Sequence, residues 1–136
     1  MGIRSYREAD RDGLVDLWRS VFPDASPHNE PVRMIDAKLA VDDLIFIAED
    51  EERIVGACMV GYDGHRGWLY ALAVRPKSRR TGLGARLVGH ALEALRGLGC
   101  VKLNLQIRSS NHAVEKFYES LGFEREERIS MGLRID

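Results

Sequence analysis

A basic, glycine-containing segment from Val74 to Val88 constrains the fold more than any other part of the sequence. The apolar run before it stops at Pro76, and an amphipathic helix is predicted to begin near Gly84. A turn that opens a helix presents unpaired backbone N–H groups at the positive end of the helix dipole, which suits an anion. Gly82 and Gly84 allow positive φ or close approach to a ligand. Five cations lie within twelve residues, namely Arg75, Lys77, Arg79, Arg80 and Arg86. We therefore expect a phosphate-bearing ligand here.

The length and charge of the chain limit the partners it can have. At 136 residues, the chain is expected to form a single domain over residues 1–136. A formal net charge of −1 makes the basic turn a local feature, which favours a ligand site over a nucleic-acid surface. No apolar run approaches the ~18 residues that span a bilayer, and the N-terminus lacks the apolar region of a signal peptide. We expect a cytoplasmic protein that binds neither nucleic acid nor membrane.

The chain has two cysteines, Cys58 and Cys100, which are far apart in the sequence and sit among apolar residues. This setting is typical of buried structural thiols rather than of a redox pair or a metal site. We therefore expect no bound metal.

Hydrophobic periodicity predicts the order of strands and helices along the chain. The expected strands cover residues 3–6, 44–49, 53–62, 68–74, 103–107 and 129–135. The expected helices cover residues 10–21, 32–40, 83–97 and 111–121, with a loop over 22–31. This order predicts an α/β (α+β) domain in which a mixed, mostly antiparallel central sheet is flanked by about four helices.

Three phosphate-binding patterns were compared with the turn. A P-loop is excluded because no lysine follows either glycine. A Rossmann dinucleotide site is disfavoured because Leu87 takes the place of the third glycine and no acidic residue ends the next strand. The third pattern, [RQ]-x-x-G-x-[GA], is matched by Arg79, Gly82 and Gly84 between a strand and a helix.

Two downstream segments add to this third pattern. Residues 111–118 read Asn-His-Ala-Val-Glu-Lys-Phe-Tyr, and residues 121–123 read Leu-Gly-Phe. Together with the turn, they resemble the GNAT superfamily of acetyl-CoA-dependent N-acetyltransferases, and the likeness covers essentially the whole chain. The turn over 61–67, Gly-Tyr-Asp-Gly-His-Arg-Gly, is similar to that of a short bacterial subgroup of the family.

The resemblance implies acetyl-CoA as cosubstrate and a set of residues that would bind it. The strand that ends at Val74 would offer backbone hydrogen bonds to the pantetheine arm, and the turn after it would wrap the pyrophosphate. Asn111 would bond the pantetheine or order the side of the site next to it. One departure is Val114, where the family often has a smaller residue. The implied binding residues are Leu72, Ala73, Val74, Arg79, Arg80, Thr81, Gly82, Leu83, Gly84, Ala85, Asn111 and Tyr118.

Direct attack of an amine on a thioester needs a polarised carbonyl, a proton for the leaving thiolate and a neutral amine. A strand N–H near Leu72 or Ala73 could polarise the carbonyl. The resemblance implies that Tyr118 protonates the thiolate, and an ordinary tyrosine pKa of about 10 suits that task. The general base stays open because residues 68–74 contain no acid, where many relatives carry one. The candidates are Asp63 and His65, which could act through water, followed by Tyr70 and His28.

The acceptor is expected to be a small cationic amine or a peptide amine. The loop over 22–31, the helix after it and the turn over 63–67 would line its pocket. These segments carry acidic and histidine side chains, and the carboxylates would attract a cation. The expected substrate residues are Asp24, His28, Glu30 and Asp63. A CoA-binding or regulatory module of the same fold without transfer activity stays open. A homodimer is also possible, because the final alternating segment has the pattern of a strand that could pair with a partner's sheet edge.

Overall fold

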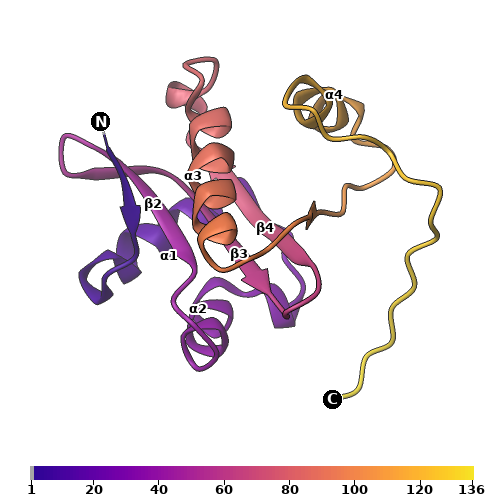
Figure 1. Ribbon diagram of the computed structural model, residues 1–136. Coiled ribbons are helices and arrows are strands. Elements are labelled where there is room, and N and C mark those ends of the chain that lie inside the picture. The colour runs from indigo at the N-terminus through magenta and orange to yellow at the C-terminus, as the bar shows by residue number, and fades with distance from the viewer. Residues whose placement is uncertain (1) are drawn as a thin grey trace. The chain divides into compact units, whose positions relative to one another are not determined.

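The sheet of the first compact unit, which runs to Leu105, brings together strands from both ends of that unit (Figure 1). The computed structural model describes residues 2–136. The strands follow one another across the sheet in chain order, and every neighbouring pair is antiparallel except the last, β4 with β5. They are β1 (Gly2–Ser5), β2 (Ile45–Asp50), β3 (Arg53–Tyr62), β4 (Gly67–Val74) and β5 (Leu103–Asn104). The predicted mixed, mostly antiparallel sheet is thereby confirmed.

Four α-helices accompany these strands in residues 2–136, as the periodicity predicts. Pro31 opens α2 at a position where its missing N–H costs nothing, and the Glu30 carboxylate caps the helix by accepting the backbone N–H of Arg33 at 3.2 Å. The α-helices are α1 (Arg11–Val21), α2 (Pro31–Leu39), α3 (Leu83–Gly97) and α4 (His112–Ser120). Short 3₁₀ turns are η1 (Glu8–Asp10), η2 (Pro27–Asn29) and η3 (Pro76–Ser78).

Opposite faces of the sheet pack against different helices (Figure 1). Ile45 and Ile47 of β2 belong to the core cluster that contains the buried face of α1. Phe46 lies between them in the sequence and meets His90 of α3 edge-on, with ring centroids 4.7 Å apart. Because side chains alternate along a strand, α1 and α3 must cover different faces.

The face under α3 depends on a glycine. A Cβ added at Gly56 on β3 would lie 3.0 Å from Leu87 Cδ1 of α3 and 3.2 Å from the backbone oxygen of Ala73. Both Leu87 and Leu83 are buried against this surface. The missing side chain at Gly56 thus lets α3 pack close to the centre of the sheet.

The second compact unit, Gln106–Asp136, contains α4. Asn111 caps its N-terminus by accepting the backbone N–H of Val114 at 3.2 Å. Within the unit, the ring of Tyr118 meets Phe117 and Phe123 edge-on, at centroid distances of 5.0 and 5.4 Å. These contacts give the short segment a small aromatic cluster of its own.

Two expectations about strands were wrong. The strand predicted over 103–107 is reduced to β5, and residues 124–136 form neither helix nor strand. The alternating side chains Ile129, Met131, Leu133 and Ile135 are each at least 87% exposed. Alternation makes a segment suitable for a sheet, but a strand forms only where a neighbour pairs with its backbone N–H and C=O groups. Pairing of this segment with a second copy stays a prediction.

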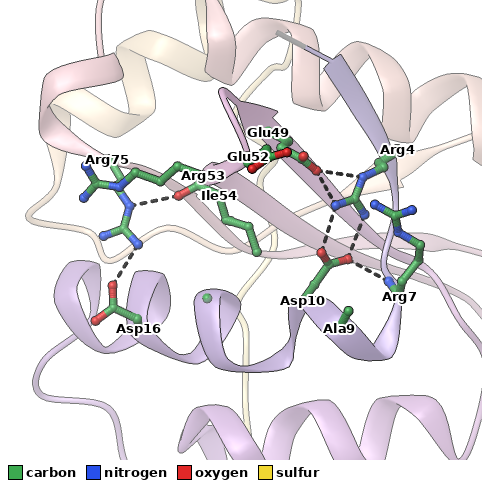
Figure 2. A pocket seen from close by; sticks show the side chains of 11 residues that line it. Arg4, Arg7, Ala9, Asp10, Asp16, Glu49, Glu52, Arg53, Ile54 and Arg75 are labelled. Carbon is green, nitrogen blue, oxygen red and sulfur yellow. Dashed lines mark hydrogen bonds and ion pairs between the residues drawn. The ribbon is translucent and has the colours of Figure 1, made fainter.

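A buried carboxylate, Asp10, joins the start of α1 to the edge of the sheet (Figure 2). Arg4 on β1 donates from Nη1 and Nη2 to the two oxygens of Asp10, at 2.7 and 2.8 Å. The same guanidinium donates from Nε to Glu49 on β2 at 3.1 Å, and Asp10 accepts the backbone N–H of Arg7 at 2.8 Å. The hydrogen bonds from Arg4 hold the pKa of Asp10 below its ordinary value. One ion network therefore ties β1, β2 and α1 together.

We expect Asp10→Asn to lower the free energy of unfolding at pH 7 by roughly 2 kcal/mol, because it removes the charge of a buried carboxylate and leaves the partly buried Arg4 guanidinium with one carboxylate fewer. A carboxyl whose pKa is lowered by folding stabilises the fold above its unfolded pKa, and this contribution disappears as the pH falls through the folded pKa. The difference between wild type and variant should therefore shrink between about pH 5 and pH 2. Urea denaturation at several pH values measures it.

The control is Asp12→Asn, since Asp12 is exposed in the first turn of α1, two residues after Asp10. This variant should change stability by no more than about 0.5 kcal/mol at any pH. A pH-independent loss in Asp10→Asn would contradict the assignment of the lowered pKa.

Candidate functional site

The centre of β4 departs from regular pairing with β3. Ala57 of β3 pairs with Ala73 of β4, and Met59 pairs with Tyr70. Between these two pairs, the single residue Cys58 of β3 lies opposite two residues of β4, Ala71 and Leu72. Ala71 has a φ of +53°, which is uncommon for a residue with a side chain. This arrangement is a β-bulge, which breaks the ladder locally and turns backbone groups out of it. Backbone N–H groups near Leu72 are the groups that the sequence predicts to polarise a carbonyl.

The bulge is held from the side of α1. Trp18 is 1% exposed and its indole Nε1 donates to the backbone oxygen of Ala71 at 2.9 Å. Neither residue was predicted to take part in the site. The sequence Leu-Tyr-Ala-Leu-Ala over 69–73 reads as an ordinary strand, and Trp18 reads as a core residue on an amphipathic helix. The one feature of the sequence that could have indicated this contact is the indole N–H of Trp18, because a buried indole N–H needs an acceptor.

The basic turn contains two residues in the left-handed region of backbone conformation. Between η3 and α3, Arg80 has a φ of +63° and Gly82 a φ of +80°. Gly82 is the N-cap of α3 and has no side chain to cap the first N–H groups of the helix. A Cβ built at Gly82 meets no atom within 4 Å. The first turn of α3 therefore has no side-chain cap, and the space beside Gly82 is open. That this turn binds an anion stays a prediction.

The five cations of the turn divide into two groups. Arg75 faces away from the turn, where its Nη2 donates to Asp16 at 2.8 Å and its Nε to the backbone oxygen of Ile54 at 2.9 Å. Arg79 donates from Nε to the Val74 oxygen at 3.0 Å, which fixes the start of the turn. Lys77, Arg80 and Arg86 are exposed, as Arg79 also is. Arg75 is therefore engaged away from the turn, and the other four cations are accessible to an anion.

Arg75 lines a polar cavity of about 470 Å³ on the α1 side of β3 (Figure 2). Its wall also contains the Arg4, Asp10 and Glu49 network. The charges in this cavity largely neutralise one another through the ion pairs drawn in Figure 2. Apart from Arg75, it contains none of the residues that the sequence predicts to bind a ligand.

The predicted catalytic residues Asp63 and His65 lie in the turn between β3 and β4. Asp63 Oδ1 accepts the backbone N–H groups of His65 and Arg66, both at 2.7 Å, and these bonds lower the pKa of Asp63. The carboxylate therefore shapes the turn and is a weaker base than an ordinary aspartate. From Gly67 to Ala71 the strand extends roughly 13 Å, at about 3.3 Å per residue. Proton transfer from the bulge to this turn would require water.

Tyr70 is the ionisable residue next to the bulge in the sequence. It is 47% exposed, and burial of its hydroxyl followed by the charge of Asp63 raises its pKa. Such a group stays protonated near neutral pH, which suits hydrogen-bond donation better than proton abstraction.

The predicted acceptor residues before α2 have different surroundings. Glu30 caps α2 and also pairs with Arg19 at 2.7 Å, and hydrogen bonding to Arg19 lowers its pKa. His28 lies within 3.2 Å of the Ser26 hydroxyl in η2. Asp24 is exposed in the preceding loop. The charge of Glu30 is thus already neutralised in part, whereas Asp24 remains exposed to solvent.

Two predicted residues belong to the second compact unit. Asn111 is exposed and caps α4, and Tyr118 is 8% exposed within the aromatic cluster. Leu72, Ala73, Val74 and the turn over 79–85 belong to the first unit and form one continuous strand, turn and helix start. The expected roles of all these residues stay predictions.

Within residues 2–136, no group of three or more His, Cys, Asp or Glu side chains is placed to hold a metal ion. None of the helices in this part of the chain has both the length and the apolarity needed to cross a membrane. Cys58 and Cys100 are buried and unpaired with each other, as expected, and burial raises the pKa of Cys58 to about 12.

Comparison with known proteins gives a consistent result. Residues 11–123 match the acetyltransferase (GNAT) family. An acetyltransferase from Pectobacterium atrosepticum is 38% identical over 136 residues, which cover 99% of this chain and 96% of that protein. An aminoglycoside N-acetyltransferase in complex with CoA superposes with a TM-score of 0.83 at 20% identity, over 98% of this chain and 93% of the other. The ribosomal-protein-S18-alanine N-acetyltransferase from Escherichia coli reaches 0.79 at 23% identity, over 92% and 78%.

Proposed function

Because the chain belongs to the GNAT acetyltransferase family and is an acyl-CoA-dependent acetyltransferase, we propose that it moves an acetyl group from acetyl-CoA to a primary amine by direct attack in a ternary complex. The observation that carries this proposal is the combination of a bulged β4 with an uncapped α3 only a short turn away. The first offers a donor for a carbonyl, and the second offers donors for a pyrophosphate.

The residues of the turn suit the pyrophosphate of acetyl-CoA. Gly82 leaves open space where any other residue would place a side chain, and Arg80 and Arg86 add positive charge without an acid in the turn. Backbone N–H groups over 81–85 would hold the phosphate oxygens, and the Leu72–Val74 backbone would hold the pantetheine arm. The net charge of the protein is near zero, so this attraction is local.

In the proposed reaction, the neutral amine nitrogen forms a bond to the thioester carbon and the carbon–sulfur bond breaks. The backbone N–H of Leu72 or Ala73 would stabilise the negative charge that develops on the carbonyl oxygen. The Tyr118 hydroxyl would give its proton to the departing thiolate, and the nitrogen would lose a proton to water connected with Asp63 or His65. Asn111 would keep the start of α4 in place.

The cofactor assignment predicts the effect of Gly82→Asp. A carboxylate at this position would face the phosphates and would also strain a residue held at positive φ, so CoA affinity should fall by at least about 100-fold. Calorimetric titration with CoA and acetyl-CoA, alongside ATP and NAD, measures this change. We expect micromolar binding of the two CoA species alone to the wild-type protein.

A matched control is Gly89→Asp, which adds the same charge to an exposed, sterically open position of α3. This variant should bind CoA within about twofold of wild type. Equal binding by the Gly82 variant and wild type would refute the pyrophosphate site, as would the absence of CoA binding altogether.

The acid assignment predicts that Tyr118→Phe lowers kcat about 100-fold while the Kd of acetyl-CoA stays nearly unchanged. Phenylalanine keeps the ring contacts with Phe117 and Phe123, so the change removes the hydroxyl and little else. Thiol release under saturating acetyl-CoA measures kcat. A variant with wild-type kcat would end this assignment.

The acceptor is proposed to be a small cationic amine or a peptide amine, attracted by the carboxylates of Asp24, Glu30 and Asp63. His28 would line the same pocket. Asparagine at Asp63 can still accept the N–H groups of His65 and Arg66, so Asp63→Asn removes charge while keeping the turn. We expect the KM for the amine to rise about fivefold and acetyl-CoA affinity to stay constant.

Asp50→Asn, at the exposed last residue of β2, is the control for a general loss of negative charge. A fall in kcat rather than a rise in KM would identify Asp63 as the base. If neither parameter moves, the acceptor binds elsewhere. CoA binding without thiol release for any amine in a broad panel would favour the alternative, a CoA-binding module without transfer activity.

A further inference from the structure

The buried indole of Trp18 contacts the backbone at the point where β4 leaves its ladder. Nε1 of Trp18 donates to the oxygen of Ala71 at 2.9 Å across 53 residues of sequence. Trp18 is otherwise enclosed in the apolar cluster between α1 and the sheet, where the Ala71 side chain also packs. A tryptophan in a core can be replaced by other large apolar residues, but this N–H has a specific acceptor in the most irregular part of the sheet.

The geometry of one peptide group connects that acceptor to the proposed chemistry. The oxygen of Ala71 and the N–H of Leu72 belong to the same peptide unit, and residues 2–136 contain no cis peptide bond. In a planar trans peptide the C=O and N–H point in opposite directions. A donor that fixes the direction of the Ala71 oxygen therefore also fixes the direction of the Leu72 N–H, which points away from the indole.

The conformation of Ala71 explains why the Ala71–Leu72 peptide needs a contact that holds it. A residue with a side chain held at a φ of +53° has alternatives of lower energy, so the bulge persists only where its surroundings determine it. The ladder with β3 assigns partners to Tyr70 and Ala73 but none to Ala71 or Leu72. The indole of Trp18 supplies a contact from outside the sheet at the unassigned peptide.

We propose that Trp18 is a positioning residue that aims the Leu72 N–H at the carbonyl oxygen of the acetyl thioester by holding the Ala71–Leu72 peptide plane. This inference rests on the proposed function and assigns the donor within it. Trp18 itself touches neither cosubstrate in this account. A donor aimed in advance at the developing charge needs no reorganisation during the reaction, which is the source of its effect on rate.

The decisive variant replaces Trp18 by benzothienylalanine, an isostere in which sulfur takes the place of the indole N–H. The more accessible Trp18→Phe removes the same donor with some loss of volume. Both should lower kcat about tenfold, since a misaimed donor loses part of the 10²–10³ that an oxyanion donor contributes. The Kd and the stoichiometry of CoA binding should stay within about twofold of wild type, because CoA has no thioester carbonyl.

Leu14→Ala is the matched control for destabilisation. Leu14 is fully buried one turn earlier on the same helix, and its side chain has no donor. If this variant loses as much thermal stability as Trp18→Phe but keeps kcat, then the fall in kcat at Trp18 is not a loss of folded protein. A variant of Trp18 whose kcat falls only in step with CoA stoichiometry would contradict the proposal.

The amide resonance of Leu72 gives a readout that does not require turnover. In the wild-type protein, acetyl-CoA should shift this ¹⁵N–¹H resonance more than CoA does, and the difference should largely disappear in the benzothienylalanine variant. Equal responses to the two cosubstrates in wild type, or wild-type kcat in the isosteric variant, would overturn the role of Trp18. Acetyl-CoA binding without acetyl transfer to any amine would refute the proposed function instead, and the Leu72 resonance would still decide this inference.

Discussion

The irregular pairing of β4 with β3 is the constraint on which the rest of the site depends. Two residues of β4 opposite a single residue of β3 require a local bend, and the strand on either side of it still pairs normally. The regular part after the bulge ends at Val74, directly before the turn that opens α3. Backbone donors at the bulge and at the helix start are thus fixed relative to each other by one short stretch of sheet.

Core packing and chemistry are connected through α1. The helix buries an apolar face against β3 and β4, and that burial supplies most of the stability of such an element. The same packing brings the Trp18 indole to the bulge, while the Asp10 network holds the first residues of the helix to the sheet edge. The position of a backbone N–H in β4 therefore depends on contacts distributed along all of α1.

Much of the fold and part of the site could be predicted from the sequence, for physical reasons that differ between elements. The helices were predictable because apolar residues recur at helical spacing, as Leu14, Leu17, Trp18 and Val21 do in α1. The turn at Gly82 was predictable because few residues other than glycine adopt its φ. The bulge at Ala71 was not, because alanine gives no sign of positive φ. The strand over 129–135 was wrongly predicted because its pattern describes one strand and contains no information about a neighbour.

The proposed recognition through backbone groups would allow the fold to persist at low sequence identity. A structure only 20% identical superposes with a TM-score of 0.83 over 98% of the chain. Where a phosphate is held by N–H groups, the sequence must preserve a backbone conformation, and only glycines and a few packing residues have to stay for that purpose. In this chain, the side-chain bond from Arg79 to the Val74 oxygen fixes the start of the turn. The proposed acceptor residues lie outside the turn, so they can change without loss of the proposed cosubstrate site.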